Sequence, residues 1–202
     1  AMRDMEIQLP WLGVAEIGNS GYRFVRIDML DVDRDLHLKE VRAISIYRDI
    51  KYRGEFKSSD ERLNKIWQVG ARTVHLNMQE YLWDGIKRDR LVWIGDMHPE
   101  VTTITNVFGA NEVVPKSLDL ARDTTDLPTW MSGISSYSIW WLLIHRDWHY
   151  YTGDKAYLEQ QKGYMTGLLK QLLSKVDTEG IECVEGDGFL DWPSNANPVA
   201  IH

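Results

Sequence analysis

The sequence predicts a mainly helical fold that is preceded by a few β-strands. Apolar residues alternate with polar ones over short stretches of residues 22–56, which is typical of half-buried strands. From Ser58 onward the apolar spacing changes to about 3.6 residues, which is typical of amphipathic helices. These helices follow one another without alternating strands, which argues against a Rossmann or TIM-barrel sheet.

The strand region follows a turn-forming run, Gly18-Asn19-Ser20-Gly21. Alternating segments begin at Tyr22, Val41 and Tyr52. Three strands with one apolar face do not make a stable domain by themselves. We therefore expect residues 1–56 to be the C-terminal strands of a β-sandwich whose other strands lie before residue 1.

Five helices are expected in residues 57–202, because residues that cap or break helices divide this part of the chain. Ser and Asp favour helix N-caps, Pro favours the first turn, and Gly favours the position after the end. In chain order the signals are Ser59 or Asp60, Pro99 and Gly109, Pro115, Ser132 or Ser135 with Gly153, and Asp154. The first helix is expected to bury Leu63, Ile66 and Val74. After Gly180 we expect a loop with a short strand at 181–184.

The composition excludes several classes of protein. The net charge of −7 argues against nucleic acid as the main partner. The single cysteine excludes a disulfide framework and a multi-cysteine zinc site. The longest apolar run, 139–144, is too short to span a bilayer, and no signal peptide is visible, so we expect no membrane partner and leave the compartment open. Nine Trp and nine Tyr against four Phe suit a surface that meets an amphipathic ligand such as a sugar.

Residues 83–96 carry the densest chemistry in the chain. This segment holds three aspartates, two arginines, one lysine and two tryptophans, and it lies between the first two expected helices, so we predict a loop. Carboxylates and guanidinium groups bond sugar hydroxyls, indole rings cover the apolar face of a sugar, and a protonated carboxyl can donate to a leaving oxygen. The alternative is a salt-bridged loop pinned by aromatic side chains.

Residues 84–96 resemble the catalytic loop of the bacterial α-L-rhamnosidases, in which an Asp, an Arg, an acidic residue, a Trp and a Gly-Asp pair occur in this order. Segments 21–25, 60–67 and 188–192 also resemble that family: a β-sandwich strand, the first helix of the catalytic domain and its later Asp-Trp loop. The resemblance covers most of residues 16–202. It implies that residues 57–202 form the N-terminal portion of an (α/α)₆ toroid, and that terminal α-L-rhamnosides are hydrolysed with inversion.

The resemblance also implies roles for single residues. The general acid would be Asp89, the sugar hydroxyls would be held by Asp84, Arg88 and Asp96, and the sugar would pack against Trp93, Trp130 and Trp192. No metal or other cofactor is implied. Arg88 favours the ionised form of Asp89, whereas a general acid must be protonated. Nearby carboxylates or burial by aromatic rings would have to outweigh Arg88.

Inversion also requires a second carboxylate as base, about 6.5–9.5 Å from the acid. The candidates in this chain are Glu100, Asp126, Glu185, Asp187 and Asp191, and none matches the position of the family's base. We therefore expect the base beyond His202, in the remainder of the parent polypeptide. Two alternatives stay open: a helical fragment that binds carbohydrate or is structural without cleaving, and a toroidal glycosidase for another sugar.

Two further patterns could suggest metal binding. His145 and His149 have the spacing of zinc-protease ligands, but Arg146 stands where the glutamate is required, so we expect them to pack or cap. The acidic residues Glu182, Glu185 and Asp187 lack the spacing of a calcium-binding EF-hand loop.

Overall fold

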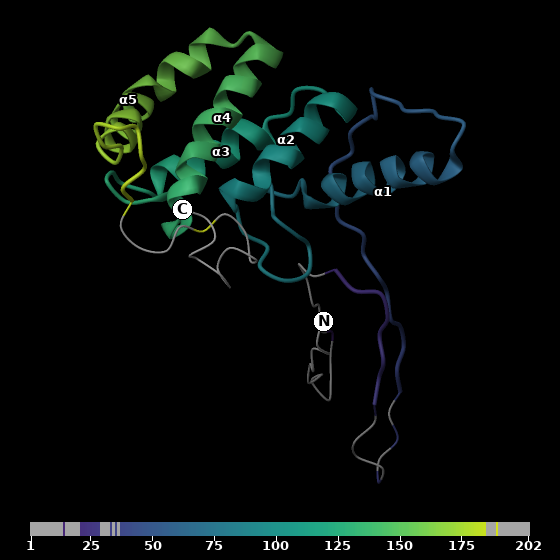
Figure 1. The fold of residues 1–202 in the computed structure, drawn as a ribbon. Helices are drawn as coiled ribbons and strands as arrows, with labels where there is room; N and C mark the ends of the chain where they lie inside the picture. Colours follow the sequence, from purple (N-terminus) through teal and green to yellow (C-terminus); the bar gives the residue numbers. More distant parts are fainter. Residues whose placement is uncertain are drawn as a thin grey trace. The chain divides into compact units, whose positions relative to one another are not determined.

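A computed structural model describes residues 14, 21–28, 33, 35, 37–184 and 189. The chain divides into two compact units, Ala1–His37 and Leu38–His202, and each is considered by itself. In the first unit, Arg26 and Asp28 form an exposed ion pair of 2.8 Å. The second unit contains every helix of the described chain (Figure 1).

The described chain contains five α-helices, as the sequence predicts. They are α1 (Glu61–Asn77), α2 (Ile94–Val107), α3 (Val113–Asp123), α4 (Ser135–Thr152) and α5 (Lys155–Leu173), with a short 3₁₀ helix, η1 (Met131–Gly133), before α4. Within the described residues, pairing between extended segments is limited to two isolated bridges, Met78–Leu82 and Val176–Glu182. The strand expected at 181–184 is therefore only a single bridge. None of the described helices combines the length and the apolar character needed to cross a bilayer.

Most of the expected helix boundaries are confirmed by their capping contacts. The Asp60 carboxylate accepts a hydrogen bond of 2.8 Å from the Arg62 amide, and Asp154 accepts one of 2.9 Å from the Tyr157 amide. Gly153 ends α4 with a left-handed φ of 68°, and Gly109 follows α2 with a φ of 87°.

Two sequence-based expectations about the helices are wrong. α2 begins at Ile94, so Pro99 lies inside it and not at its start. A proline so close to the start removes a single backbone hydrogen bond, and the helix continues past it. In α1 the buried residues lie in the C-terminal half, which packs on α2, whereas Leu63 and Ile66 are 46% and 58% exposed.

The core lies where α2 and α4 pack together, and α1, α3 and α5 surround this pair (Figure 1). Ile104 and Ile144, one from each central helix, are fully buried. The buried Trp141 ring joins α4 to α3, because its Nε1 donates a hydrogen bond of 3.0 Å to the Leu118 carbonyl. Gln161 of α5 is also fully buried, and its Nε2 donates to Asp119 of α3 at 2.9 Å.

The residues before α1 are held by the helices. The amides of Arg53 and Gly54 both bond to the Val107 carbonyl at the end of α2, at 2.7 and 3.0 Å, and His75 of α1 contacts the Arg48 carbonyl at 2.7 Å. The described part of residues 22–56 contains no strand, in contrast to the expectation from the sequence. The assignment of residues 1–56 to a β-sandwich, with a boundary at 56/57, stays a prediction.

Candidate active site

The connection between α1 and α2, residues 78–93, folds back on itself. The amide of Trp83 donates to the carbonyl of Asn77, the last residue of α1, at 3.0 Å. The amide of Asp84 donates to the Leu91 carbonyl at 3.0 Å, and the Leu91 amide donates to the Asp84 carboxylate at 2.9 Å. These two hydrogen bonds between residues 84 and 91 close the loop, so that residues 85–90 form its tip.

The tip carries an ion pair between neighbouring residues, Arg88 and Asp89. Arg88 Nε lies 3.1 Å from Asp89 Oδ1, and the hydrogen bond and charge of Asp89 raise the pKa of the guanidinium. The Arg88 side chain is 75% exposed and that of Asp89 is 30% exposed. Arg90 follows with a left-handed φ of 55°, which a non-glycine residue rarely adopts. The tip therefore presents a partly shielded carboxylate with a freely accessible cation beside it.

Asp96 lies in the first turn of α2 and not in the loop, because the helix begins at Ile94. The Asp96 amide bonds to the carbonyl of Trp93, the N-cap residue, at 3.0 Å. The helix dipole and the free amides of a first turn favour a carboxylate at this position. The early start of α2 thus places the Gly-Asp pair of the predicted loop on a rigid element.

Glu100, one turn further along α2, is a buried carboxyl that the sequence suggests only as a possible base. It is 7% exposed, its Oε1 accepts a hydrogen bond of 3.0 Å from Asn77 Nδ2, and its buried Oε2 has no hydrogen-bond partner. Burial raises the pKa of Glu100 to about 8, against the opposing bond from Asn77, and the charges of Asp96 and Asp84 raise it further. Glu100 is therefore protonated at neutral pH, which makes it unsuitable as a base.

Aromatic side chains gather where α2 and α4 begin. The rings of Trp93 and Tyr137 meet edge to face at 6.1 Å, and Tyr137 meets Phe189 at 6.4 Å. The Ser136 hydroxyl donates to the Phe189 carbonyl at 2.8 Å, which ties Phe189 to the start of α4. A Cβ on Gly95 would collide with the Tyr137 ring, so replacement of this glycine would force the ring to shift. Tyr137 was missed by the sequence analysis, because only the fold brings it to Trp93.

The other predicted site residues are less clearly placed. Trp130 is partly buried and packs against the hydrophobic core. A tryptophan with a purely structural role would pack in the same way. Trp192 lies outside the described residues, although Phe189 of the same segment is described. The connection between α1 and α2 thus carries Asp84, Arg88, Asp89 and Trp93. Asp96 follows in the first turn of α2.

Comparisons with known proteins identify the family of this chain. A family model described as the bacterial alpha-L-rhamnosidase 6 hairpin glycosidase domain matches residues 51–201. The chain belongs to this family. A crystal structure of the GH78 family rhamnosidase of Bacillus sp. GL1 matches with a TM-score of 0.65 and 27% identity, over 72% of this chain and 16% of that one. No curated protein matches significantly. The expected six-hairpin glycosidase fold is therefore confirmed.

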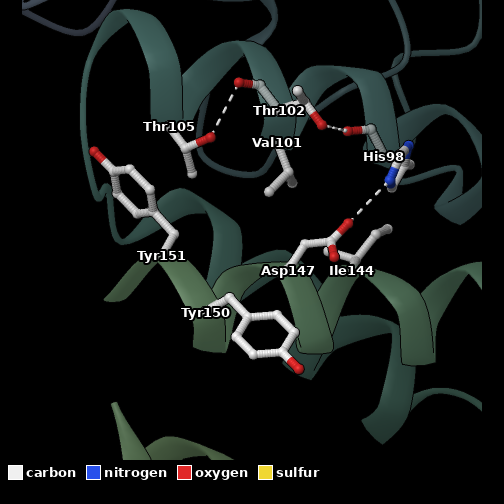
Figure 2. A pocket seen from close by; sticks show the side chains of 8 residues that line it. All are labelled: His98, Val101, Thr102, Thr105, Ile144, Asp147, Tyr150 and Tyr151. Carbon is white, nitrogen blue, oxygen red and sulfur yellow. Dashed lines mark hydrogen bonds and ion pairs between the residues drawn. The ribbon is translucent and has the colours of Figure 1, made fainter. Parts of the chain in front are cut away.

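This rhamnosidase-family chain also has a groove between α2 and α4, with a volume of about 380 Å³ (Figure 2). His98 Nε2 lies 3.2 Å from Asp147 Oδ2 on its wall, and Tyr150 and Tyr151 form the opposite end. Partial burial opposes ionisation of Asp147, but hydrogen bonds from Arg146 and His98 hold its pKa below its usual range. None of the site residues predicted from the sequence lines this groove.

Of the two histidines of α4, His145 packs in the core, as expected. His145 is 2% exposed, its Nδ1 contacts the Trp141 carbonyl at 2.8 Å, and its ring stacks on Tyr157 at 5.7 Å. Burial lowers the pKa of His145 to about 4, so the ring is neutral at pH 7. No group of three or more potential metal ligands occurs among the residues that the structure describes. Glu185 and Asp187 of the acidic loop lie outside those residues.

Proposed function

We propose that this chain carries the general-acid loop of an inverting glycosidase that releases terminal α-L-rhamnose from glycosides. The observation that supports the proposal best is the closed loop 84–91, which holds the acidic tip beside the first turn of α2 in a chain of the rhamnosidase family. The chain spans 16% of the length of the Bacillus enzyme, so the activity is proposed for the natural full-length protein.

Asp89 is the proposed general acid, since it is a partly exposed carboxyl at the tip of the loop. Its carboxylate accepts a hydrogen bond from Arg88, whereas proton donation requires the protonated carboxyl. Arg88 is exposed enough to leave Asp89 without repacking the loop. We propose that Arg88 turns to the hydroxyls of the bound sugar, which frees Asp89 to hold the proton that it delivers to the leaving oxygen.

Asp84, Asp96 and the aromatic group at the helix starts are the proposed sugar-binding groups. Carboxylates at a loop closure and a helix N-terminus are fixed acceptors for sugar hydroxyls. Trp93 offers the apolar surface, with Trp130 and Trp192 as further proposed contacts. The base that activates water is proposed to lie beyond His202, because none of the five candidate carboxylates in this chain matches the position of the base in the rhamnosidases that it resembles.

The experiment is the substitution Asp89→Asn in the full-length natural protein, assayed on two α-L-rhamnosides. A general acid contributes about 100- to 10,000-fold to the rate. We expect kcat/KM to fall in this range for an alkyl rhamnoside, whose leaving group needs a proton, and much less for p-nitrophenyl α-L-rhamnoside. Substrates with other sugars, assayed in parallel, test the alternative that the toroid acts on a different glycoside.

Asp123→Asn is the matched control. Asp123 also pairs with the preceding arginine, at 2.7 Å, but it lies on α3. We expect this variant to keep full activity. Unchanged activity of Asp89→Asn on both substrates would contradict the role of Asp89, and a full-length protein that binds rhamnose but releases none would support a binding module.

A further inference from the structure

Arg48, in the segment before α1, reaches the start of the connection between α1 and α2. Its Nε and Nη2 both donate to the Gln79 carbonyl, at 3.1 and 2.9 Å, and its Nη1 lies 3.1 Å from Glu112 Oε1. Gln79 also bonds back to the same segment, because its Nε2 donates to the Ile46 carbonyl at 3.2 Å. The Arg48 side chain is only 23% exposed, and hydrogen bonds from a charged donor are stronger than neutral ones.

Backbone hydrogen bonds link Gln79 to the closed loop 84–91. The Gln79 amide donates to the Asn77 carbonyl at 2.9 Å, and the Trp83 amide donates to the same carbonyl at 3.0 Å. The closed loop begins at the next residue and carries Asp89 at its tip. A displacement of Gln79 would therefore be passed on to the loop that carries the proposed acid.

α3 holds the same turn through a separate contact. The Leu82 amide donates to the Ser117 hydroxyl of α3 at 2.8 Å, and both residues are fully buried. The Ser117 hydroxyl in turn donates to the Val113 carbonyl at 2.7 Å. Because this contact does not involve Arg48, loss of the Arg48 side chain should displace the loop without releasing it from the domain.

We propose that Arg48 is a positioning residue for the reaction, which holds the loop so that Asp89 reaches the leaving oxygen. The inference rests on the proposed role of Asp89 as general acid. Proton transfer requires the acid within hydrogen-bond reach of the oxygen that it protonates. A displacement of about 1 Å can lower a rate about 100-fold. Loss of Arg48 should therefore impair the hydrolysis of substrates whose leaving group needs a proton.

The test is Arg48→Met in the full-length natural protein, compared with the wild type on two substrates. The measured quantity is kcat/KM for an alkyl α-L-rhamnoside divided by kcat/KM for p-nitrophenyl α-L-rhamnoside. Weaker binding of the rhamnose, or a smaller folded fraction, affects both substrates alike and cancels in this ratio. We expect the ratio to fall about 10- to 100-fold, because only the alkyl leaving group depends on the acid.

Arg122→Met is the matched control. The Arg122 side chain is 24% exposed and bonds to Asp119 at 3.1 Å and to Gln161 at 2.6 Å, on α3 and α5. We expect this variant to keep the wild-type ratio. An unchanged ratio in Arg48→Met, together with a lowered ratio in Asp89→Asn, would overturn the inference. An unchanged ratio in Asp89→Asn would instead contradict the proposed role of Asp89, on which the inference rests.

A milder variant and a second readout keep the test decisive if Arg48→Met does not fold. Lysine keeps the positive charge but lacks the planar fork of donors, so Arg48→Lys should lower the ratio about two- to tenfold. Amide hydrogen exchange of Trp83 reports on the turn directly and requires no activity. We expect this amide to exchange severalfold faster in Arg48→Lys than in Arg122→Met. Equal exchange in the two variants would overturn the inference.

Discussion

Asp84 stabilises the loop that carries the proposed general acid. Its backbone amide and its side chain both bond to Leu91, so the loop tip is fixed by a hydrogen bond that needs an acceptor at position 84. At the tip, Arg88 and Asp89 form an ion pair with each other at 3.1 Å. This division leaves the acid–arginine pair free to rearrange when a ligand binds.

The grouping of the candidate site residues could be predicted from the sequence only where they are neighbours in the chain. Asp84, Asp89 and Asp96 lie within one short segment, so their grouping was visible. Tyr137 lies far along the chain from Trp93 and reaches it only through the packing of α4 on α2. The buried state of Glu100 likewise depends on Asn77 and the end of α1, which no local pattern reveals.

His145 provides a prediction about pH at the scale of a single residue. Burial lowers its pKa to about 4 from the usual 6.5, so on acidification the unfolded chain takes up a proton before the folded one does. The resulting stability is complete above about pH 6.5 and is lost as pH falls toward about 4, by up to about 3 kcal/mol.

The measurement is urea unfolding of the wild type and of His145→Phe at pH 7 and pH 4.5. Because phenylalanine does not titrate, we expect the variant to lose less stability than the wild type between these two values. The exposed His37, changed to Phe, is the control and should behave as the wild type does. An equal loss in both variants would contradict a buried neutral His145.

At the scale of elements, the sequence predicted which helices exist better than where they begin. Asp60, Gly153 and Asp154 cap their helices as expected, because capping depends on hydrogen bonds within a few residues. Pro99 misled the prediction, because α2 continues past the proline despite the lost backbone hydrogen bond, and the packing of Ile94 and Met97 in the core favours the earlier start. The buried half of α1 was not predictable, because it depends on where α2 lies.

Gly54 provides a prediction about how the segment before α1 attaches to α2. A Cβ at this position would collide with the backbone oxygen of Asn106, beside the Val107 carbonyl that binds the Arg53 and Gly54 amides. We expect Gly54→Ala to lower the free energy of unfolding by about 1–3 kcal/mol. Chemical denaturation measures this change.

Gly70→Ala is the matched control. Gly70 lies within α1, and nothing lies within 4 Å of an added Cβ. Since alanine favours helices, this variant should gain about 0.5–1 kcal/mol. If Gly54→Ala is as stable as Gly70→Ala, residues 53–54 do not lie against α2 as described.

At the scale of the whole molecule, the helices belong to a six-hairpin glycosidase domain of the rhamnosidase family. The buried pair α2 and α4 supports the loop and the aromatic group from one side, so the site depends on the packing of the domain as well as on the loop sequence. The proposed base lies elsewhere in the polypeptide, which makes the stereochemistry of the reaction a property of the full-length protein.

Proton NMR of the first sugar released by the full-length natural protein from an α-L-rhamnoside tests the account most directly. When a water molecule lies between the acid on this loop and a distant base, hydrolysis inverts the anomeric carbon. The first product should therefore be β-L-rhamnose, which then equilibrates with the α-anomer. Initial release of α-L-rhamnose, or no release of rhamnose at all, would contradict the account.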